Sequence, residues 1–207
     1  MNTIITIGRE FGSGGRELGR LIAQKLGFAY YDKEIISLIA ERSELTETYV
    51  HNIVEHRPFV SFPIHIGQTL QPEINPLQMQ SQELFQVQCD ILNEMSEKSD
   101  CVIVGRCADY ILSEKDPIRI FVYADMESRL ARCRQNNQDQ KDLSDRELKN
   151  LIQDVDRQRK SYYEFYTGNR WADRLNYDIC VNSSKISLEK LAESIAVVVR
   201  NMKEEKN

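Results

Sequence analysis

The chain opens with an apolar run, a glycine-rich turn and an amphipathic helix, and this succession constrains the fold more than any other feature. Residues 3–7 read TIITI, the turn follows as GREFGSGG, and apolar side chains then recur at helical spacing, at Leu18, Leu21, Ile22 and Leu26. Such a turn directs several backbone N–H groups at one point, beside the positive end of the helix dipole. A strand, a glycine-rich turn and a helix in this order predict a phosphate-binding loop.

The turn supplies the residues that we expect to hold the phosphate. These are Gly8, Gly12, Ser13, Gly14, Gly15, Arg16 and Glu17. Glycine lets the backbone adopt positive φ angles and approach phosphate oxygens closely. A tight turn without a ligand is the alternative, but four glycines within eight residues favour the binding interpretation.

Short apolar runs alternate with helical patterns along the rest of the chain. Strands are predicted at 28–31, 101–104, 118–123 and 177–181, and each is followed by a turn and a helical pattern. Five strands separated by helices imply right-handed crossovers. The sequence therefore predicts an α/β fold with a five-stranded, mostly parallel sheet and helices on both faces.

Two segments lie outside this alternation. Residues 43–100 hold four of the five prolines and are predicted to form an insertion, whereas 136–167 begins polar and becomes an amphipathic helix suited to a lid. We expect a single domain over residues 1–207, with its core at 1–42 and 101–207. The apolar, proline-bearing insertion is compatible with a homodimer surface.

Composition narrows the classes of protein. Hydrophobic residues make up 41% and charged residues 29%, as in soluble globular proteins, and no apolar stretch approaches the roughly 20 residues that span a bilayer. Because residues 3–7 do not form a signal peptide, we expect a cytoplasmic protein without a membrane partner. The net charge of −5 argues against a nucleic-acid polymer as partner but permits small anionic ligands. Five scattered cysteines without a Cys-x-x-Cys pair argue against a disulfide framework and a zinc site.

Two ligand-binding interpretations of the turn compete. The spacing G-x-x-x-G-x-G, which begins at Gly8, is similar to the dinucleotide loop of short-chain dehydrogenases, and Asp32 would then hold a ribose hydroxyl. Those NAD(P) oxidoreductases use a Tyr-x-x-x-Lys pair, but none of the nine tyrosines has a lysine four residues later. The oxidoreductase is therefore the less favoured interpretation.

The other interpretation is a P-loop kinase, whose loop reads G-x-x-x-x-G-K-[ST]. Five residues, not four, separate Gly8 from Gly14 here, and Gly15 stands where the lysine is expected. Arg16 is the predicted replacement cation, since a guanidinium binds phosphate oxygens in a bidentate manner.

Arginines recur in order along the second half of the chain. They are Arg106 after the third predicted strand, Arg129 and Arg132 on one helical face after the fourth, and Arg157 and Arg159 beside Asp156 before the fifth. An isolated arginine on a helix is usually solvated, and Asp156 with Arg159 would be an ordinary i,i+3 ion pair. Their ordered recurrence, with Arg106 at the carboxyl edge where such sheets bind ligands, indicates cations around a transferred phosphoryl group.

These segments give the chain a resemblance to the bacterial cytidylate kinases and, more closely, to the cytidylate kinase-like proteins grouped beside them. The resemblance covers most of the chain outside 43–100 and rests on REFGSGGRELG, YYDKEII, FVYADMESRLARCR, DRQR and YDICVNSSKISLEKL. It implies a P-loop nucleotide kinase fold with a lid and a helical insertion, and contact of Asp156 and Arg159 with the acceptor nucleotide and phosphates. The chain departs from cytidylate kinases at Gly15, where they have the lysine, and at Ile152, where their lid has a further arginine.

We therefore expect ATP-dependent transfer of a phosphoryl group to a small acceptor, most simply a nucleoside monophosphate such as CMP. ATP and Mg²⁺ are the expected cofactors, with Ser13 and Asp32 near the metal through water. The residues expected to neutralise charge during transfer are Arg16, Arg129, Arg132, Arg157 and Arg159. Those expected to bind the acceptor are Asp32, Arg106, Asp156 and Arg159, with helix capping as the alternative role of Asp32. A regulatory module that binds ATP or another phosphate compound without turnover is the second class of function.

Overall fold

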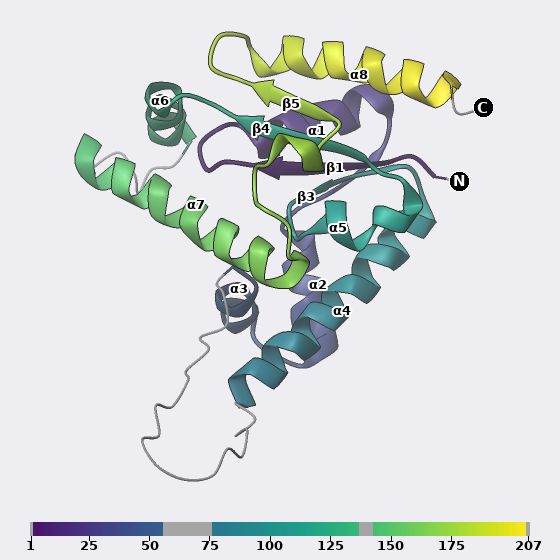
Figure 1. Cartoon of the computed structure of the whole chain (residues 1–207), viewed down its shortest axis with the longest axis vertical. Helices are drawn as coiled ribbons and strands as arrows, with labels where there is room; N and C mark the ends of the chain where they lie inside the picture. The colour runs from purple at the N-terminus through teal and green to yellow at the C-terminus, as the bar shows by residue number, and fades with distance from the viewer. Residues whose placement is uncertain (1, 56–75, 137–142, 206–207) are drawn as a thin grey trace.

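In the computed structural model, which describes residues 2–55, 76–136 and 143–205, five parallel strands form one sheet (Figure 1). The strands are β1 (Ile4–Arg9), β2 (Ala29–Tyr31), β3 (Cys101–Val104), β4 (Ile118–Tyr123) and β5 (Ile179–Asn182). They lie in the order β2-β3-β1-β4-β5, and every neighbouring pair is parallel. The predicted five-stranded parallel sheet is confirmed.

The strand order also decides between the two ligand-binding interpretations of the glycine turn. In the Rossmann arrangement of dinucleotide-binding enzymes, the first strand lies beside the second. Here β3 and β4 flank β1, and β2 lies at the edge of the sheet. The oxidoreductase interpretation is therefore wrong, because the spacing of the glycines is shared by two folds whose sheets are wound differently.

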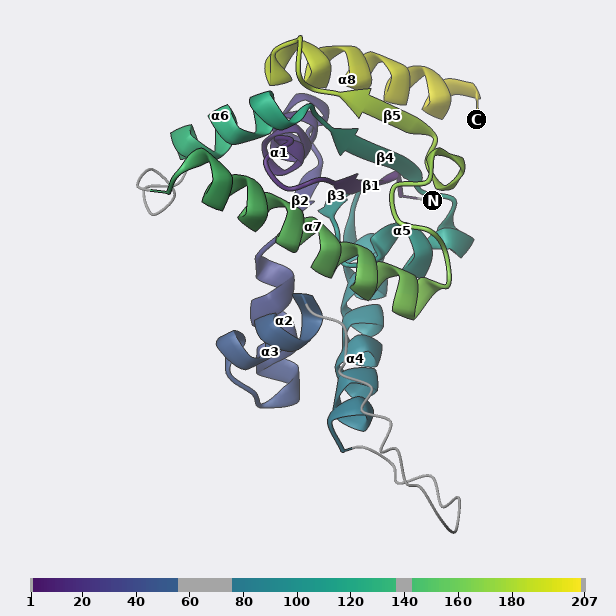
Figure 2. The same ribbon diagram turned by 60° about the vertical axis from the view of Figure 1, so that its left-hand side comes forward.

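Helices connect the strands and cover both faces of the sheet. They are α1 (Gly15–Leu26), α2 (Glu34–Ser43), α3 (Glu47–Glu55), α4 (Pro76–Lys98), α5 (Ala108–Ile111), α6 (Met126–Asn136), α7 (Asp145–Thr167) and α8 (Leu188–Glu205), with 3₁₀ turns η1 (Ser113–Lys115) and η3 (Arg174–Asn176). Helices α1 and α8 lie together over one face, while α4, α5 and α7 lie on the other side (Figure 1 and Figure 2). None of the helices in the described part of the chain is long and apolar enough to cross a membrane.

Alternate side chains of the central strands build two separate hydrophobic layers. Ile5 and Ile7 are fully buried against α1 and α8, whereas Ile4 and Ile103 pack with residues of α2, α4 and α7. Successive side chains of a strand point to opposite faces, so a strand covered on both sides has a continuous apolar sequence. Burial of one such isoleucine stabilises the fold by roughly 1.5–3 kcal/mol. This is why the central strands are recognisable in the sequence.

The described parts of the predicted insertion, α3 and α4, belong to the same hydrophobic layer as the sheet. Val50 on α3 and Leu84 on α4 are at most 2% exposed and cluster with Ile4 of β1. Helix α3 and the first turns of α4 project beyond the sheet (Figure 2). Residues 56–75, with the VSFPIHIGQ stretch, and residues 137–142 of the expected lid lie outside the described residues. The single-domain organisation stays a prediction.

The expected lid is, over its described residues, one long helix that lies against the glycine turn. Helix α7 begins at Asp145, after the polar start of the predicted segment, where a capping box fixes its first turn: the Ser144 hydroxyl accepts the Glu147 N–H, and the Glu147 carboxylate accepts the Ser144 N–H. Leu148 and Ile152, two residues of the predicted apolar stripe, are fully buried and pack with α6 and with Phe11.

Candidate active site

The glycine turn joins the carboxyl end of β1 to the N-terminus of α1. Gly12 and Gly14 have φ angles of +77° and +83°, in the left-handed region that favours glycine. Gly14 is the N-cap of α1, and no side chain of the described residues caps this helix. Because the first N–H groups of a helix have no partner within it, the turn leaves backbone donors open to an anion at the positive end of the dipole.

The backbone carbonyls of the turn are hydrogen-bonded within the protein, and those of Arg9, Phe11, Gly12 and Ser13 accept from residues of other segments. The carbonyl of Arg9 accepts from Arg159, that of Glu10 from the Ser13 hydroxyl, Phe11 from Arg129, Gly12 from Arg132, Ser13 from Ser183 and Gly14 from the Leu18 N–H, at 2.6–3.2 Å. The N–H groups of Glu10, Phe11 and Ser13 are bonded to protein acceptors as well, so those of Gly12, Gly14 and Gly15 are the donors of the turn that suit an anion. The turn is therefore a preorganised cradle for an anion.

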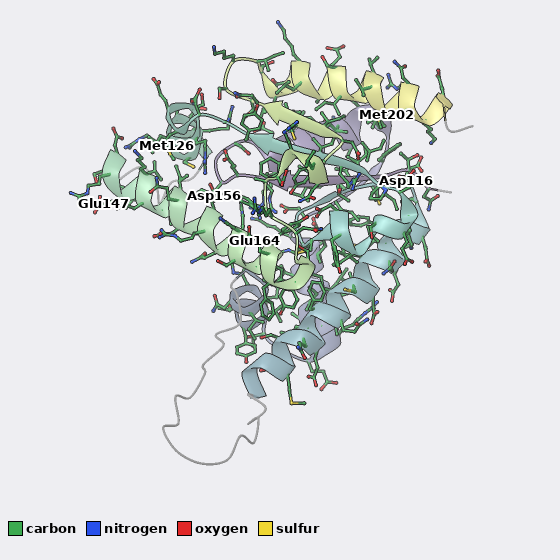
Figure 3. All side chains as sticks on the ribbon, viewed as in Figure 1. Asp116, Met126, Glu147, Asp156, Glu164 and Met202 are labelled. Carbon is green, nitrogen blue, oxygen red and sulfur yellow. The ribbon has the colours of Figure 1, made fainter. Side chains whose placement is uncertain are left out.

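Arg129 fastens this cradle to α6 and α7. Its guanidinium is 6% exposed, donates from Nε to the Phe11 carbonyl at 2.6 Å and pairs with Asp156. The other oxygen of Asp156, a residue in the middle part of α7 (Figure 3), accepts the Phe11 N–H at 2.7 Å. Glu10 Oε2 lies 3.2 Å from Arg129 Nη1, and burial raises the pKa of Glu10 although the Ala124 N–H and Arg129 act to lower it. Two carboxylates and one guanidinium thus hold the turn.

This arrangement differs from the roles that the sequence suggests for these side chains. Both oxygens of Asp156 are bonded, to Arg129 and to the turn, so the carboxylate holds the cradle instead of facing an acceptor. Arg129 likewise positions the turn from beneath. Arg157 is not brought to the site: its side chain is 70% exposed and pairs with Asp154. The roles differ because the buried backbone carbonyls of a tight turn also require hydrogen-bond donors, and arginine side chains supply them here.

Arg132 and Ser183 hold the other side of the cradle. Arg132 donates to the carbonyls of Gly12 at 3.1 Å and Ser183 at 3.0 Å, and the Ser183 hydroxyl donates to the Ser13 carbonyl at 2.6 Å. Ser13 is fully buried, and its own hydroxyl donates to the Glu10 carbonyl at 2.9 Å. The Ser13 side chain is therefore turned into the loop, away from the position expected beside a metal.

A cavity of about 290 Å³ opens over the cradle and the first turn of α1. The charged residues that line it are Arg9, Glu10, Arg16, Glu17, Lys33, Arg132 and Arg159. Five of these seven are cations, so the cavity attracts anions although the protein as a whole is acidic. Its volume is near the lower end of the roughly 300–1,000 Å³ typical of small-molecule sites.

Arg16, the expected replacement for the P-loop lysine, is engaged by Asp32. Its Nε lies 2.7 Å from Asp32 Oδ2, and the Arg16 side chain is 48% exposed while that of Asp32 is 8% exposed. The N-cap of α2 is Lys33, and this helix has no side-chain cap among the described residues. Asp32 therefore orients Arg16 and does not cap the following helix.

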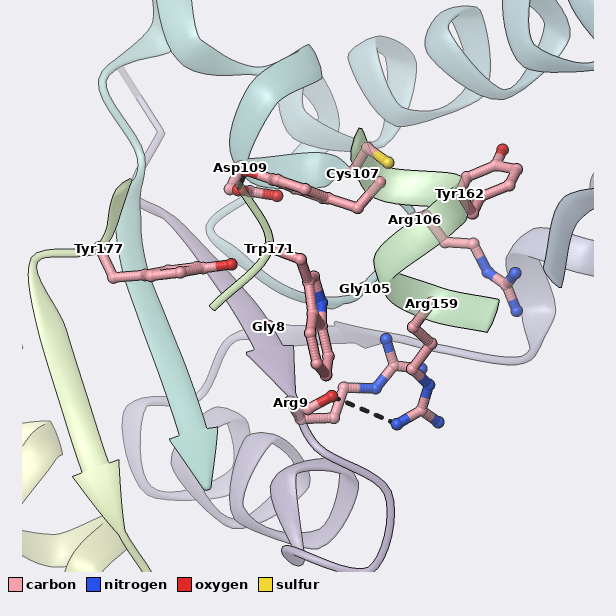
Figure 4. Close-up of a pocket in the computed structure, with 11 residues that line it drawn as sticks. Gly8, Arg9, Gly105, Arg106, Cys107, Asp109, Arg159, Tyr162, Trp171 and Tyr177 are labelled. Carbon is pink, nitrogen blue, oxygen red and sulfur yellow. Dashed lines mark hydrogen bonds between the residues drawn. The ribbon is translucent and has the colours of Figure 1, made fainter. Parts of the chain in front are cut away.

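A smaller cavity of about 50 Å³ lies beside the first, at the carboxyl edge of β1 and β3 (Figure 4). It is lined by Gly8, Arg9, Gly105, Arg106, Cys107, Asp109, Arg159, Tyr162, Tyr163, Trp171 and Tyr177. The Tyr163 hydroxyl donates to Asp109 at 2.6 Å, and burial raises the pKa of Asp109. Arg9 and Arg159 line both cavities, so they lie at the junction between them.

The turn after β3 is strained at the edge of this smaller cavity. Arg106 and Cys107 have backbone φ angles of +60° and +53°, which residues other than glycine rarely adopt. The turn is supported by Gln88 of α4, whose amide donates to the Arg106 carbonyl at 2.9 Å. Residues held in such conformations gather at binding and active sites. Arg106 therefore lies where the sequence predicted it, at the carboxyl edge of the sheet.

Comparisons with known proteins agree with this geometry. A family model described as the cytidylate kinase-like family matches residues 4–185. The chain belongs to this family. Among solved structures, an uncharacterized protein from Eubacterium ventriosum is similar over 96% of this chain and 99% of its own, with a TM-score of 0.69 and 24% identity.

Shikimate kinases share the fold of this cytidylate kinase-like protein. The enzyme from Bacteroides thetaiotaomicron is similar over 98% of each chain, with a TM-score of 0.56 and 16% identity. The enzyme from Acinetobacter baumannii is similar over 98% of this chain and 95% of its own, with a TM-score of 0.53 and 16% identity. A search of curated proteins found no match. The fold is that of P-loop kinases.

Several cavity residues of this family member do not stand out in its sequence, among them Arg9, Lys33, Asp109 and Trp171. Asp109 and Trp171 follow no motif and reach the cavity only through the packing of α5 and the segment after α7. For Arg9 a signal exists, because counting back from Gly14 places four residues between the two, as the P-loop spacing requires.

Proposed function

We propose that the protein transfers the γ-phosphoryl group of ATP to a small acceptor, with a nucleoside monophosphate such as CMP as the first candidate. The observation that carries this proposal is the cradle itself: the carbonyls of Phe11, Gly12 and Ser13 accept hydrogen bonds from other segments, its helix has no side-chain cap among the described residues, and five cations line the cavity above it. Membership of the cytidylate kinase-like family supports the same reaction class.

The cradle suits the β and γ phosphates of ATP. Backbone N–H groups from Gly14 into the first turn of α1 bind the phosphate oxygens, and Arg132 and Lys33 add positive charge from the cavity wall. Mg²⁺ usually binds phosphate oxygens together with one or two carboxylates. Glu17 lines the cavity and provides such a carboxylate, whereas the Ser13 hydroxyl is turned away. When bound, the metal neutralises charge on the β and γ oxygens.

The acceptor enters from the side of the smaller cavity. Arg106 suits a phosphate or carboxylate of the acceptor, and the aromatic rings of Tyr162 and Trp171 suit a planar group. The cavity is too small for a nucleotide as it stands, so acceptor binding requires these side chains to move. The acceptor oxygen then attacks the γ-phosphorus as the bond to the β–γ bridging oxygen breaks, which gives ADP and the phosphorylated acceptor. Positioning and electrostatics supply the catalysis.

Incubation with Mg²⁺ and γ-labelled ATP, with a panel of nucleoside monophosphates and other small hydroxyl acceptors, tests this function. We expect a labelled product with at least one acceptor. Arg106→Met is expected to lower kcat/KM for that acceptor by at least about tenfold, the effect of losing hydrogen bonds to a charged group. Arg20→Met, an exposed change on α1 outside both cavities, is the matched control.

A second candidate is a regulatory module that binds ATP without turnover. It is favoured by Gly15 at the position of the P-loop lysine and by the pairing of Arg16 with Asp32. Micromolar ATP binding without transfer to any acceptor would establish this second function and contradict the kinase.

A further inference from the structure

The space above Gly15 is filled by the side chain of Arg9. A Cβ atom added to Gly15 would lie 2.5 Å from Cβ and 3.0 Å from Cγ of Arg9. Contacts this short do not occur between real side-chain atoms, so residue 15 must be glycine while the Arg9 stem lies there. The Arg9 side chain can therefore take this path only because residue 15 has no side chain.

The sequence spacing agrees with this packing. Residues 10–13 separate Arg9 from Gly14, so Arg9 stands at the first glycine of G-x-x-x-x-G-K-[ST] and Gly15 stands at its lysine. The cation and the glycine of the motif have exchanged places. Counted from Gly8, the loop is one residue too long; counted from Arg9, it has the ordinary length.

A second glycine makes room for the head of the same side chain. Gly105, after β3, has a φ of +75°, and a Cβ atom there would lie 2.8 Å from Cζ of Arg9. Gly15 thus accommodates the stem and Gly105 the guanidinium of Arg9, which is 8% exposed and lines both cavities (Figure 4). Two glycines from distant parts of the chain direct one arginine to the junction of the cavities.

Arg16 has a different environment. Its side chain is about half exposed, and Asp32 Oδ2 lies 2.7 Å from its Nε. A carboxylate at this distance offsets much of the attraction that Arg16 would exert on a phosphate. Arg9 lines both cavities together with Arg159, whose Nη1 donates to the Arg9 carbonyl at 3.2 Å.

We propose that Arg9 is the phosphate-binding cation of this loop and that it replaces the P-loop lysine through the exchange of positions 9 and 15. This inference rests on the proposed function, since it assigns a cation to the phosphates of ATP. From the junction of the two cavities the guanidinium contacts the γ-phosphoryl group on the side that faces the acceptor.

Calorimetric binding of Mg²⁺ with a non-hydrolysable ATP analogue separates the two arginines. We expect Arg9→Met to weaken binding about tenfold to hundredfold, as expected for lost hydrogen bonds to a charged group. Arg16→Met is expected to have a smaller effect, and the exposed Arg20→Met no effect. Wild-type affinity in Arg9→Met, or a larger loss in Arg16→Met, would overturn this inference while leaving the kinase proposal intact. A wild-type protein that binds no ATP analogue would overturn both.

A swap of the two positions tests the exchange itself. Arg9→Gly is expected to lose binding, and the double variant Arg9→Gly with Gly15→Lys, which restores the first glycine and the lysine of the motif, is expected to regain at least about tenfold of it. No gain in the double variant would contradict the exchange.

The packing can be tested without any ligand. Gly15→Ala is expected to lower the thermal unfolding midpoint in the wild-type background but not in the Arg9→Gly background, because only the former holds the Arg9 stem against position 15. Equal effects in the two backgrounds would show that Arg9 does not occupy this space.

Discussion

Arg129 joins three parts of the chain through a single buried guanidinium, which contacts Glu10, Phe11 and Asp156. Removal of one partner from a buried ion pair leaves the other charges without compensation. We expect Arg129→Met to lower the free energy of unfolding by about 3–5 kcal/mol, measured by urea denaturation. Arg157→Met, which removes an exposed ion pair within α7, should change it by less than about 1 kcal/mol. Similar values for the two variants would contradict the role of Arg129.

Asp109, which lines the smaller cavity, is expected to make the stability of the protein depend on pH. Burial raises its pKa, so the folded protein binds this proton more tightly than the unfolded chain does. The stabilising contribution is fully present below the ordinary aspartate pKa and is lost as the pH rises through the raised value. We expect the thermal midpoint of Asp109→Asn, compared with wild type, to increase as the pH is raised from about 4 to 8.

Asp100 provides a control of opposite sign. Burial alone would raise its pKa, but the Thr3 N–H at 2.6 Å and the Lys203 ammonium lower it. Its contribution is therefore present above the ordinary aspartate pKa and is lost as the pH falls. Asp100→Asn should be less stable than wild type at neutral pH and approach it in acid. If both variants changed in the same direction, the raised pKa of Asp109 would be refuted.

At the scale of elements, the order of the first turns of α7 depends on the capping box of Ser144 and Glu147. This helix carries Asp156 and Arg159. Ser144→Ala removes one side of this box and is expected to destabilise the protein by about 1 kcal/mol. We expect faster amide hydrogen exchange in the first turns of α7 and little change after Ile152, where burial holds the helix. Lys149→Ala, an exposed change on the same helix, is the control. Uniform exchange along α7 in Ser144→Ala would show that the cap is not what orders its start.

The accuracy of sequence-based prediction differs between elements for a physical reason. The bounds of β3 and β4 agree with the prediction because these strands are buried on both faces and have continuous apolar sequences. The edge strand β5 begins at Ile179, later than predicted at 177, because half of its side chains are exposed and its apolar pattern is weak. The capping box of Ser144 and Glu147 also depends only on neighbouring residues. Its position is difficult to predict because several other polar residues nearby could equally begin a helix.

At the scale of the whole molecule, the candidate site is assembled from the N-terminal turn, α6, α7 and the end of β5. Residue types and spacing predicted the turn, the arginines and their order along the chain. They did not predict that Arg129, Arg132 and Arg159 donate to the carbonyls of the turn. A motif describes what a loop offers to a ligand, but the backbone groups on its outer side also require partners, and these come from distant segments.

Because distant helices hold the cradle, a ligand bound to it is expected to order them as well. We expect Mg²⁺ and a non-hydrolysable ATP analogue to raise the thermal midpoint and to slow amide hydrogen exchange in 8–17, in α6 and in the middle of α7. Adenosine, which lacks phosphates, should change neither the thermal midpoint nor the hydrogen exchange in these three segments.

Arg132 offers a test of this coupling once the analogue is saturating. Its guanidinium links the Gly12 carbonyl on the turn with the Ser183 carbonyl after β5. In Arg132→Met, saturating analogue should still protect 8–17, but protection of α6 should fall because one of its two arginine links to the turn is gone and only that of Arg129 remains. Protection confined to 8–17 in the wild type would mean that the helices do not contribute to the affinity of the cradle for its ligand, since energetic coupling between two sites acts in both directions.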